Sequence, residues 1–537
     1  MKKIKYLFLA ILLISVVSCS DETPSPSNND TILTEDVTFE LDSEIKSIGF
    51  KEHYETLIQE ASAGNDEESA IWLAYAQAQL DTLELIEKEY INQAGANWDV
   101  NADGGGHHNR ALGYEYATLR YKSIDQNGKD VMLSTLVVWP FNNIIPDPDA
   151  NNVIIGCHVT IGSNDERPTN YSKNSIGTDV GMLASCAISY LPGKVYENLV
   201  IIPDYQGYGA THGEIHPYLS QDLTARQVLD GVRAGIKFYK EYLKHKLEED
   251  WTSLSTGYSQ GGSVAMAVQR YVEKNNLTDE FNYKGSVCGS GPYDPVATLE
   301  YYISTDQLYM PVAAAMMMNS LCKTNPRLMG KYTPADFLTD AAMESGIIDM
   351  IDFKKKNTNE VNEALLKYSL EFNLADTDKL CMYRKAMDGF YPYRKDTKDN
   401  YKWESGNKTS YAKTSDVIRP EVINWMIGKQ DPAHKDKMEA LVGALKDNVL
   451  YTDWTPATST FLFHTIGDEV VPFVNYENCL AAWKGSDKVK AFRCKGLTQS
   501  HVAYGTVFFG NDISTGIRAI FGNKTHNYKF EQTLGGI

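Results

Sequence analysis

The pentapeptide at residues 257–261, Gly-Tyr-Ser-Gln-Gly, constrains the fold of this chain more than any other feature of its sequence. It lies between a strand-like run at 254–258 and a helix-like run at 263–272. This context is typical of a nucleophile elbow, a sharp strand-to-helix turn that holds a serine in a strained backbone conformation. We therefore expect Ser259 at the end of a sheet, beside a helix N-terminus that can stabilise negative charge. The alternative is an ordinary turn with a buried serine.

A serine hydroxyl is a weak nucleophile at neutral pH, so it needs a histidine to accept its proton and an acid to orient that histidine. Asp468 follows a predicted apolar strand at 459–465, and His501 follows a second predicted strand at 488–494. The order serine, acid, histidine along the chain is one of those found in catalytic triads. Each residue alone is also compatible with a turn aspartate or a helix-cap histidine, but together Ser259, Asp468 and His501 predict a triad.

Other polar residues near predicted strands have weaker claims. Asp294 follows the strand after the elbow helix and is the alternative acid of the triad. Asp204 precedes Ser259 and fits the chain order poorly, so we expect it to hold the following glycine-rich turn through bonds to the backbone. His464 lies inside the strand before Asp468 and is expected to shape the loop of the acid.

Acyl transfer also requires an oxyanion hole, usually formed by two backbone N–H groups. The residue after the nucleophile, Gln260, is the first expected donor. The second should come from the loop after an earlier core strand, which is predicted at 152–157. Val159 and Thr160 in that loop are the alternatives, and His158 is expected to brace the loop rather than to transfer protons.

Taken together, these motifs resemble the α/β-hydrolase fold. Within it, residues 257–262 and the segment Pro-Asp-Tyr-Gln-Gly-Tyr-Gly at 203–209 resemble the secretory lipase and esterase branch. The resemblance covers residues 110–300 and 456–525. It implies an α/β fold with a mainly parallel, eight-stranded central sheet and helices on both faces. It also implies ester hydrolysis through an acyl-enzyme, without a metal or an organic cofactor. Many hydrolases of this fold have His-Gly where this chain has His-Val.

The N-terminus reads as an export signal. Residues 1–18 combine early lysines with a short apolar core, as secretion signals do. Cys19 follows small residues and resembles the lipidated cysteine of a bacterial lipobox. The acidic residues after it resemble the tag of Bacteroidota surface lipoproteins. We therefore expect secretion across the inner membrane, a tether at 19–41, and contact with the outer membrane only through the lipid anchor.

The remaining layout follows from length and pattern. A chain of 537 residues can hold two or three structural units. We predict an N-terminal helical segment at 42–105, the first part of the hydrolase core at 106–300, a cap insertion at 301–455, and the second part of the core at 456–537. A methionine-rich run in the cap is expected to pack in its core.

Charge and motifs limit the partners. The net charge of −19 argues against nucleic acid, whose phosphates would be repelled. His107 and His108 follow three glycines, but no carboxylate or cysteine at ligand spacing supports a metal site.

The leading hypothesis is a surface-anchored, lipase- or esterase-like serine hydrolase that cleaves a small-molecule or glycan-linked carboxylic ester. The alternatives are a serine aminopeptidase-like amide hydrolase on the same fold and a non-catalytic binding lipoprotein.

Overall fold

A single mixed sheet forms the centre of the molecule in the computed structural model. The model describes residues 37–64, 67–94, 112–142, 149–191, 194–366, 370–373, 408–493 and 500–522. The predicted signal peptide, Cys19, most of the tether, His107 and His108 therefore lie outside the described residues. None of the helices in the described ranges combines the length and apolarity needed to span a bilayer.

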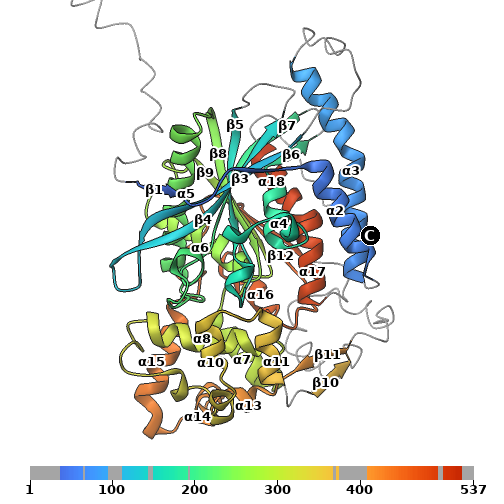
Figure 1. Cartoon of the computed structure of the whole chain (residues 1–537). Helices are drawn as coiled ribbons and strands as arrows, with labels where there is room; N and C mark the ends of the chain where they lie inside the picture. Colours follow the sequence, from blue (N-terminus) through green and yellow to red (C-terminus); the bar gives the residue numbers. More distant parts are fainter. Residues whose placement is uncertain are drawn as a thin grey trace, which may run out of the picture.

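Eleven strands of the described chain join this sheet, in the order β1-β3-β4-β7-β5-β8-β9-β12-β13, with β2 beside β3 and β6 beside β7 (Figure 1). Their bounds are β1 Phe39–Leu41, β2 Lys46–Gly49, β3 Leu112–Ile124, β4 Asp130–Asn142, β5 Ala150–Cys157, β6 Ile188–Leu191, β7 Lys194–Pro203, β8 Leu247–Tyr258, β9 Tyr283–Gly289, β12 Ser459–His464 and β13 Val489–Arg493. The path from β3 to β13 contains the eight strands that the family resemblance implies. The short strands β1, β2 and β6 are additions, so the expected count of eight was too low.

The half of the sheet from β7 to β13 is parallel, whereas β1 to β4 pair antiparallel. All eight residues of β5 are buried, as expected for a parallel strand covered on both faces. The mainly parallel α/β sheet predicted from sequence is confirmed.

Helices cover both faces of this sheet (Figure 1). On one face lie α5 Gln221–Lys237 and α6 Gln260–Lys274. On the other lie α4 Asp179–Ser185, α17 His501–Val507 and α18 Ile513–Gly522, with α2 Phe50–Ser62 and α3 Glu67–Ala94 outside them. Two π-helical segments, Phe238–Tyr242 and Phe508–Asp512, continue α5 and join α17 to α18.

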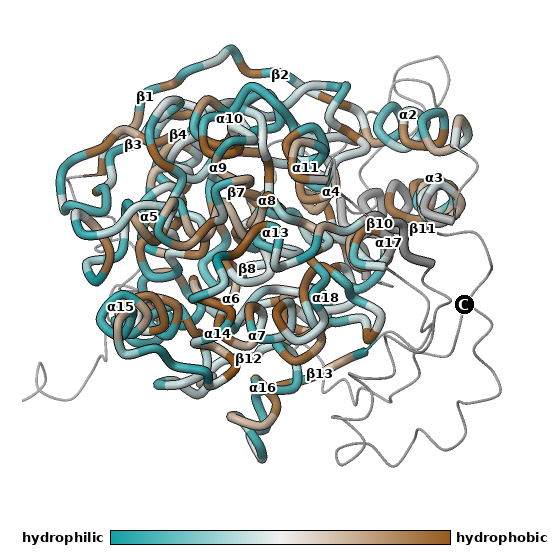
Figure 2. The backbone as a smooth tube through the Cα atoms, turned by 90° about the horizontal axis from the view of Figure 1, so that it is seen from below, coloured by the Kyte–Doolittle hydropathy of each residue, from teal (hydrophilic) through white to brown (hydrophobic). Residues whose placement is uncertain are grey.

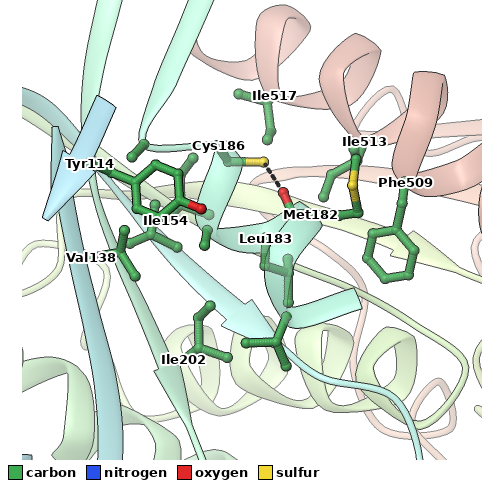
Figure 3. Packing of buried hydrophobic residues seen from close by; sticks show 14 of the residues in the cluster. Tyr114, Val138, Ile154, Met182, Leu183, Cys186, Ile202, Phe509, Ile513 and Ile517 are labelled. Atoms are coloured by element: carbon green, nitrogen blue, oxygen red, sulfur yellow. Dashed lines mark hydrogen bonds between the residues drawn. The ribbon is translucent and has the colours of Figure 1, made fainter. Parts of the chain in front are cut away.

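Alternation along the strands divides the core into two layers. In β5, Ile154 packs with α4 and α18, as Figure 3 shows, while Val153 and Ile155 pack with α5 and α6. This division follows from the period of two in a β-strand, which sends successive side chains to opposite faces.

The N-terminal segment contains the predicted helices as α2 and α3, but it begins with the strand β2, and β1 forms at the end of the predicted tether. Strand β2 pairs antiparallel with β3, from Lys46 opposite Tyr116 to Gly49 opposite Gly113. The buried ring of His53 in α2 bonds the hydroxyl of Tyr114 at 2.9 Å. The segment is therefore joined to the sheet by main-chain and side-chain bonds.

A helical insertion separates β9 from β12 and lies at one end of the sheet (Figure 1). It comprises α7 Pro295–Thr305, α8 Pro311–Thr324, α9 Asp340–Glu344, α10 Ile347–Phe353, α11 Thr358–Leu366, β10 Leu370–Asn373, β11 Lys408–Tyr411, α13 Thr414–Val417, α14 Pro420–Met426, α15 Lys435–Lys446, and short 3-10 turns. Seen along this end, α7, α8 and α13 overlie the sheet strands (Figure 2). The insertion has its own apolar core, in which Met316, Met317 and Met318 are buried, as predicted.

The register of the parallel strands brings their carboxyl ends to one edge. Tyr258 of β8 lies opposite Gly289 of β9, which lies opposite Phe463 of β12. His464 of β12 lies opposite Arg493 of β13. Loops that leave these strands therefore begin side by side, which is where such folds place their sites.

Candidate active site

The turn from β8 to α6 has the strained geometry expected of a nucleophile elbow. Ser259 has φ 57° and ψ −124°, a combination that favours glycine, and its N–H donates to Gly289 O at 2.9 Å. A Cβ on Gly257 would lie 2.3 Å from Cys157 O, and one on Gly261 would lie 2.1 Å from the same oxygen. The two glycines of the motif are thus required because the turn lies against the end of β5.

The structure brings Ser259, Asp468 and His501 into one hydrogen-bonded chain. His501 Nε2 lies 2.9 Å from Ser259 Oγ. His501 Nδ1 lies 2.9 Å and 2.8 Å from the two carboxylate oxygens of Asp468. All three residues are buried, with 4–8 % of their surface exposed. Because Nδ1 faces a carboxylate, it carries the proton, and Nε2 is left to accept one from the serine.

The loop after β12 holds the acid in place. Asp468 Oδ1 accepts hydrogen bonds from the N–H groups of Val470 at 3.1 Å and Val471 at 2.7 Å. His464 Nε2 donates to Val471 O at 3.0 Å. Burial lowers the pKa of His464 despite the nearby charge of Asp468, so this ring stays neutral. His464 therefore shapes the acid loop, as expected from its position in the strand.

Two further residues hold the main chain of His501, and no sequence motif singled them out. Glu469 Oε2 accepts the N–H of His501 at 2.9 Å. The hydroxyl of Tyr258 donates to His501 O at 2.7 Å. One of these residues follows Asp468 in the chain and the other precedes Ser259. Their adjacency to the motif residues is the only signal by which they could have been found.

The charges of the acid loop act on both neighbouring groups. Burial alone would lower the pKa of His501, but the charge and hydrogen bond of Asp468, with a smaller contribution from Glu469, raise it above its ordinary value of 6.5. Burial raises the pKa of Glu469 to about 7, and the charge of Asp468 adds to this effect. Glu469 therefore changes charge close to neutral pH, and Asp468 favours the imidazolium form of His501.

The expected oxyanion donors differ in their availability. Gln260 is the first residue of α6, so its N–H has no acceptor within the helix. In the loop after β5, the N–H of Val159 donates to Asp179 Oδ2 at 2.8 Å and is already engaged. Of the two alternatives in that loop, Thr160 is therefore the better candidate.

Hydrogen bonds hold the loop after β5 in place and connect it to the insertion. The N–H groups of Gly162 and Ser163 donate to Glu166 Oε2 at 3.0 Å and 2.8 Å. Thr358 Oγ1, at the start of α11, donates to Thr160 O at 3.4 Å. The position of this loop thus depends on contacts within the sheet domain and on the insertion.

The side chain of Gln260 forms a hydrogen bond with the ring of His216. Its Nε2 lies 2.9 Å from His216 Nε2, and His216 Nδ1 lies 3.0 Å from Gln206 O. Burial lowers the pKa of His216 to about 3, so the ring is neutral. It donates from Nδ1 and accepts from Gln260 at Nε2. This bond fixes the first turn of α6 next to Ser259.

The alternative acid occupies a different place. Asp294 Oδ1 accepts the N–H of Ala297 at 2.9 Å and caps α7. Its Oδ2 accepts hydrogen bonds from Asn478 Nδ2 at 3.0 Å and from the Tyr451 hydroxyl. The imidazole of His501 bonds Asp468 instead.

Asp204 was expected to bond the backbone of the glycine-rich turn directly, but its side chain bonds other residues. Its buried carboxylate accepts from Ser134 Oγ at 2.5 Å and from Thr169 N and Oγ1 at 2.8 Å and 2.6 Å. The glycine-rich turn is reached indirectly, because Ala210 N donates to Ser134 Oγ at 2.9 Å. His158 Nε2 lies 3.2 Å from Asp204 O, and its Nδ1 lies 2.7 Å from the carbonyl of the next residue. His158 thus lies between two backbone carbonyls, which suits a bracing role.

Metal ligands do not gather in the described part of the chain. Within those residues no group of three or more His, Cys, Asp or Glu side chains is placed to hold a metal ion.

The fold is similar to solved structures of known proteins. The rice cell wall degrading esterase LipA from Xanthomonas oryzae matches with a TM-score of 0.54 and 19% identity, over 78% of this chain and 92% of that one. A structure from Legionella pneumophila matches with a TM-score of 0.56 and 17% identity, over 78% and 91%. No protein-family model and no curated protein matches the sequence. At this identity the similarity shows the fold, which is α/β-hydrolase-like with helical insertions.

Proposed function

We propose that this chain is a serine hydrolase that cleaves carboxylic esters through an acyl-enzyme. The observation that carries the proposal is the chain of hydrogen bonds from Ser259 Oγ through His501 to Asp468, built on a strained elbow. Strain of this kind persists where the surrounding structure enforces it, and it clusters at functional sites. The similarity of the fold to an esterase supports the same reading.

In the first half-reaction, Ser259 Oγ attacks the ester carbonyl carbon while His501 Nε2 accepts the hydroxyl proton. Asp468 keeps its negative charge, holds the proton on Nδ1 and stabilises the imidazolium that forms. The imidazolium then donates its Nε2 proton to the leaving alkoxide, and the acyl group stays on Ser259. In the second half-reaction, His501 Nε2 accepts a proton from the water that attacks the acyl carbon. The bond from this carbon to Ser259 Oγ then breaks, His501 returns the proton to Ser259 Oγ, and the acid is released.

The oxygen of the tetrahedral intermediate needs fixed donors in a site with little water. We assign this role to the N–H groups of Gln260 and Thr160. The free N–H at the start of α6 supports the first. The engagement of the Val159 N–H by Asp179 favours Thr160 as the second.

The substrate and location follow as parts of this proposal. We propose a small-molecule or glycan-linked ester as substrate, since the similar LipA fold belongs to an enzyme that degrades cell walls. The insertion above the strand ends would shape the pocket. We also propose that Cys19 carries lipid and anchors the protein at the outer membrane.

The test is hydrolysis of p-nitrophenyl esters of increasing acyl length, compared with aminoacyl anilides. Ser259→Ala should lower kcat by at least about three orders of magnitude. Ser304→Ala, an exposed serine of the insertion, is the matched control and should stay active. Faster turnover of anilides than of esters would favour an aminopeptidase. A wild-type chain that neither turns over substrate nor reacts with a fluorophosphonate would indicate a binding protein.

A further inference from the structure

We propose that Glu469 is a positioning residue, whose carboxylate fixes the main chain of His501 so that the imidazole stays between Ser259 and Asp468. This inference rests on the proposed function, since it concerns the same site. It assigns a second carboxylate of the acid loop to the reaction, distinct from the one that bonds the ring.

The contacts of His501 carry the proposal. His501 is the first residue of α17, and its N–H donates to Glu469 Oε2 at 2.9 Å. Its carbonyl accepts the Tyr258 hydroxyl at 2.7 Å. Both polar groups of the His501 main chain are thus held by side chains adjacent in sequence to the other two members of the triad. The spacing of nucleophile, base and acid is set through these neighbours as well as through the ring.

These two hydrogen bonds to the main chain of His501, here called the clamp, matter because the bonds of the ring change during the reaction. Once Ser259 is acylated, its oxygen no longer donates to His501 Nε2, and the ring keeps only its bond to Asp468. The clamp on the main chain remains throughout the cycle. A displacement of about 1 Å can lower a rate by about 100-fold, so a fixed backbone at this residue supports both half-reactions.

The surroundings of Glu469 suit a group that works beside a charged imidazole. Its side chain is buried, with 9% of the residue exposed. The ionisable groups that face it come from several elements: Asp468 on its own loop, His501 on α17, Tyr258 on β8, Tyr301 and Tyr302 on α7, and Tyr309. Burial raises its pKa to about 7, so it is largely ionised in mildly alkaline solution. There its charge also favours the imidazolium form of His501.

The test compares Glu469→Ala with Glu469→Gln in the full chain. The alanine removes the acceptor for the His501 N–H, whereas the glutamine keeps an oxygen acceptor and removes the charge. We expect Glu469→Ala to lower kcat by tenfold or more with little change in KM. We expect Glu469→Gln to recover most of kcat at pH 8. The acid limb of its kcat/KM profile should shift to lower pH, because the charge that raises the pKa of His501 is gone. Asp487→Asn removes an exposed carboxylate and is the matched control.

The outcomes separate this inference from the proposed function. Glu469→Ala with kcat within twofold of wild type, together with an inactive Ser259→Ala, would overturn the positioning role and leave the triad intact. Full activity in Ser259→Ala would overturn both. If Glu469→Ala does not fold, Glu469→Leu, which fills the site without an oxygen acceptor, takes its place in the comparison with Glu469→Gln. A kcat within twofold of that of Glu469→Gln would then overturn the inference, and a kcat at least tenfold lower would support it.

Discussion

The backbone of Ser259 yields a quantitative prediction about stability. Its φ of 57° and ψ of −124° lie in a region that costs a residue with a Cβ about 1–3 kcal/mol. Glycine adopts this conformation freely but loses more backbone entropy on folding, about 0.5–1 kcal/mol. Ser259→Gly and Ser259→Ala both remove the hydroxyl, so the lost bond to His501 cancels between them. The midpoints of these two ranges differ by about 1 kcal/mol, so the glycine variant should be more stable than the alanine variant by about that amount.

Urea unfolding followed by tryptophan fluorescence measures this difference, with the same slope required for both variants. Ser263 provides the matched control, because it is buried in the first turn of the same helix α6. There the order should reverse, since alanine is favoured over glycine in a helix by about 0.5–1 kcal/mol. An alanine variant at 259 that is as stable as the glycine variant would refute the claim that the elbow stores strain.

Three further predictions concern the turn and its charges. Gly261→Ala places a Cβ 2.1 Å from Cys157 O and should lower the free energy of unfolding in urea by at least about 2 kcal/mol. Gly49→Ala is the control and should have little effect, because the nearest neighbour of its Cβ would lie at 3.9 Å. Equal destabilisation by the two substitutions would contradict a steric clash at Gly261. The pKa of Glu469 rises from its ordinary 4.5 to about 7 on folding, so the free energy of unfolding of the wild type falls, by up to about 3 kcal/mol, as pH rises between these values. Glu469→Gln should therefore gain stability relative to wild type over this interval, and a constant difference would argue against the raised pKa. His501 has a pKa above 6.5 and must be neutral to accept a proton, so kcat/KM should fall as pH is lowered through a midpoint above 6.5; a midpoint below it would contradict the effect of Asp468.

Short-range patterns predicted the elbow because its serine and glycines are close together in the sequence, although the atom that excludes larger residues there, Cys157 O of β5, is distant in the chain. Ser259 needs glycines two residues away on both sides, and the clash distances at Gly257 and Gly261 show why other residues fail there. The candidate triad needed more than a local pattern. His501 meets a serine 242 positions before it in the chain because β8 and β13 end at one edge of the sheet, with β9 and β12 between them. The order of Ser259, Asp468 and His501 along the chain indicated that they act together, whereas the order of the strands in the sheet brings them into contact.

Features that depend on contacts between distant parts of the chain could not be predicted from the sequence. Strands β1 and β2 have three and four residues and exist through their pairing with β3, which no short window can show. The N–H of Val159 donates to Asp179, a residue 20 positions further along the chain, and is therefore not free to bind an oxyanion. Glu469 shows no periodicity or motif, and only the packing of α17 against the acid loop reveals its bond to His501.

Identification of the residue that becomes covalently modified is the sharpest test of Ser259 as the nucleophile. The full chain is treated with a fluorophosphonate, digested, and analysed by peptide mass spectrometry, with Ser259→Ala in parallel. We expect one adduct, on Ser259, which is absent from the variant and forms much more slowly in His501→Ala. A wild-type chain that hydrolyses esters while its adduct lies on another residue, or one whose Ser259→Ala variant reacts equally fast, would contradict this role of Ser259.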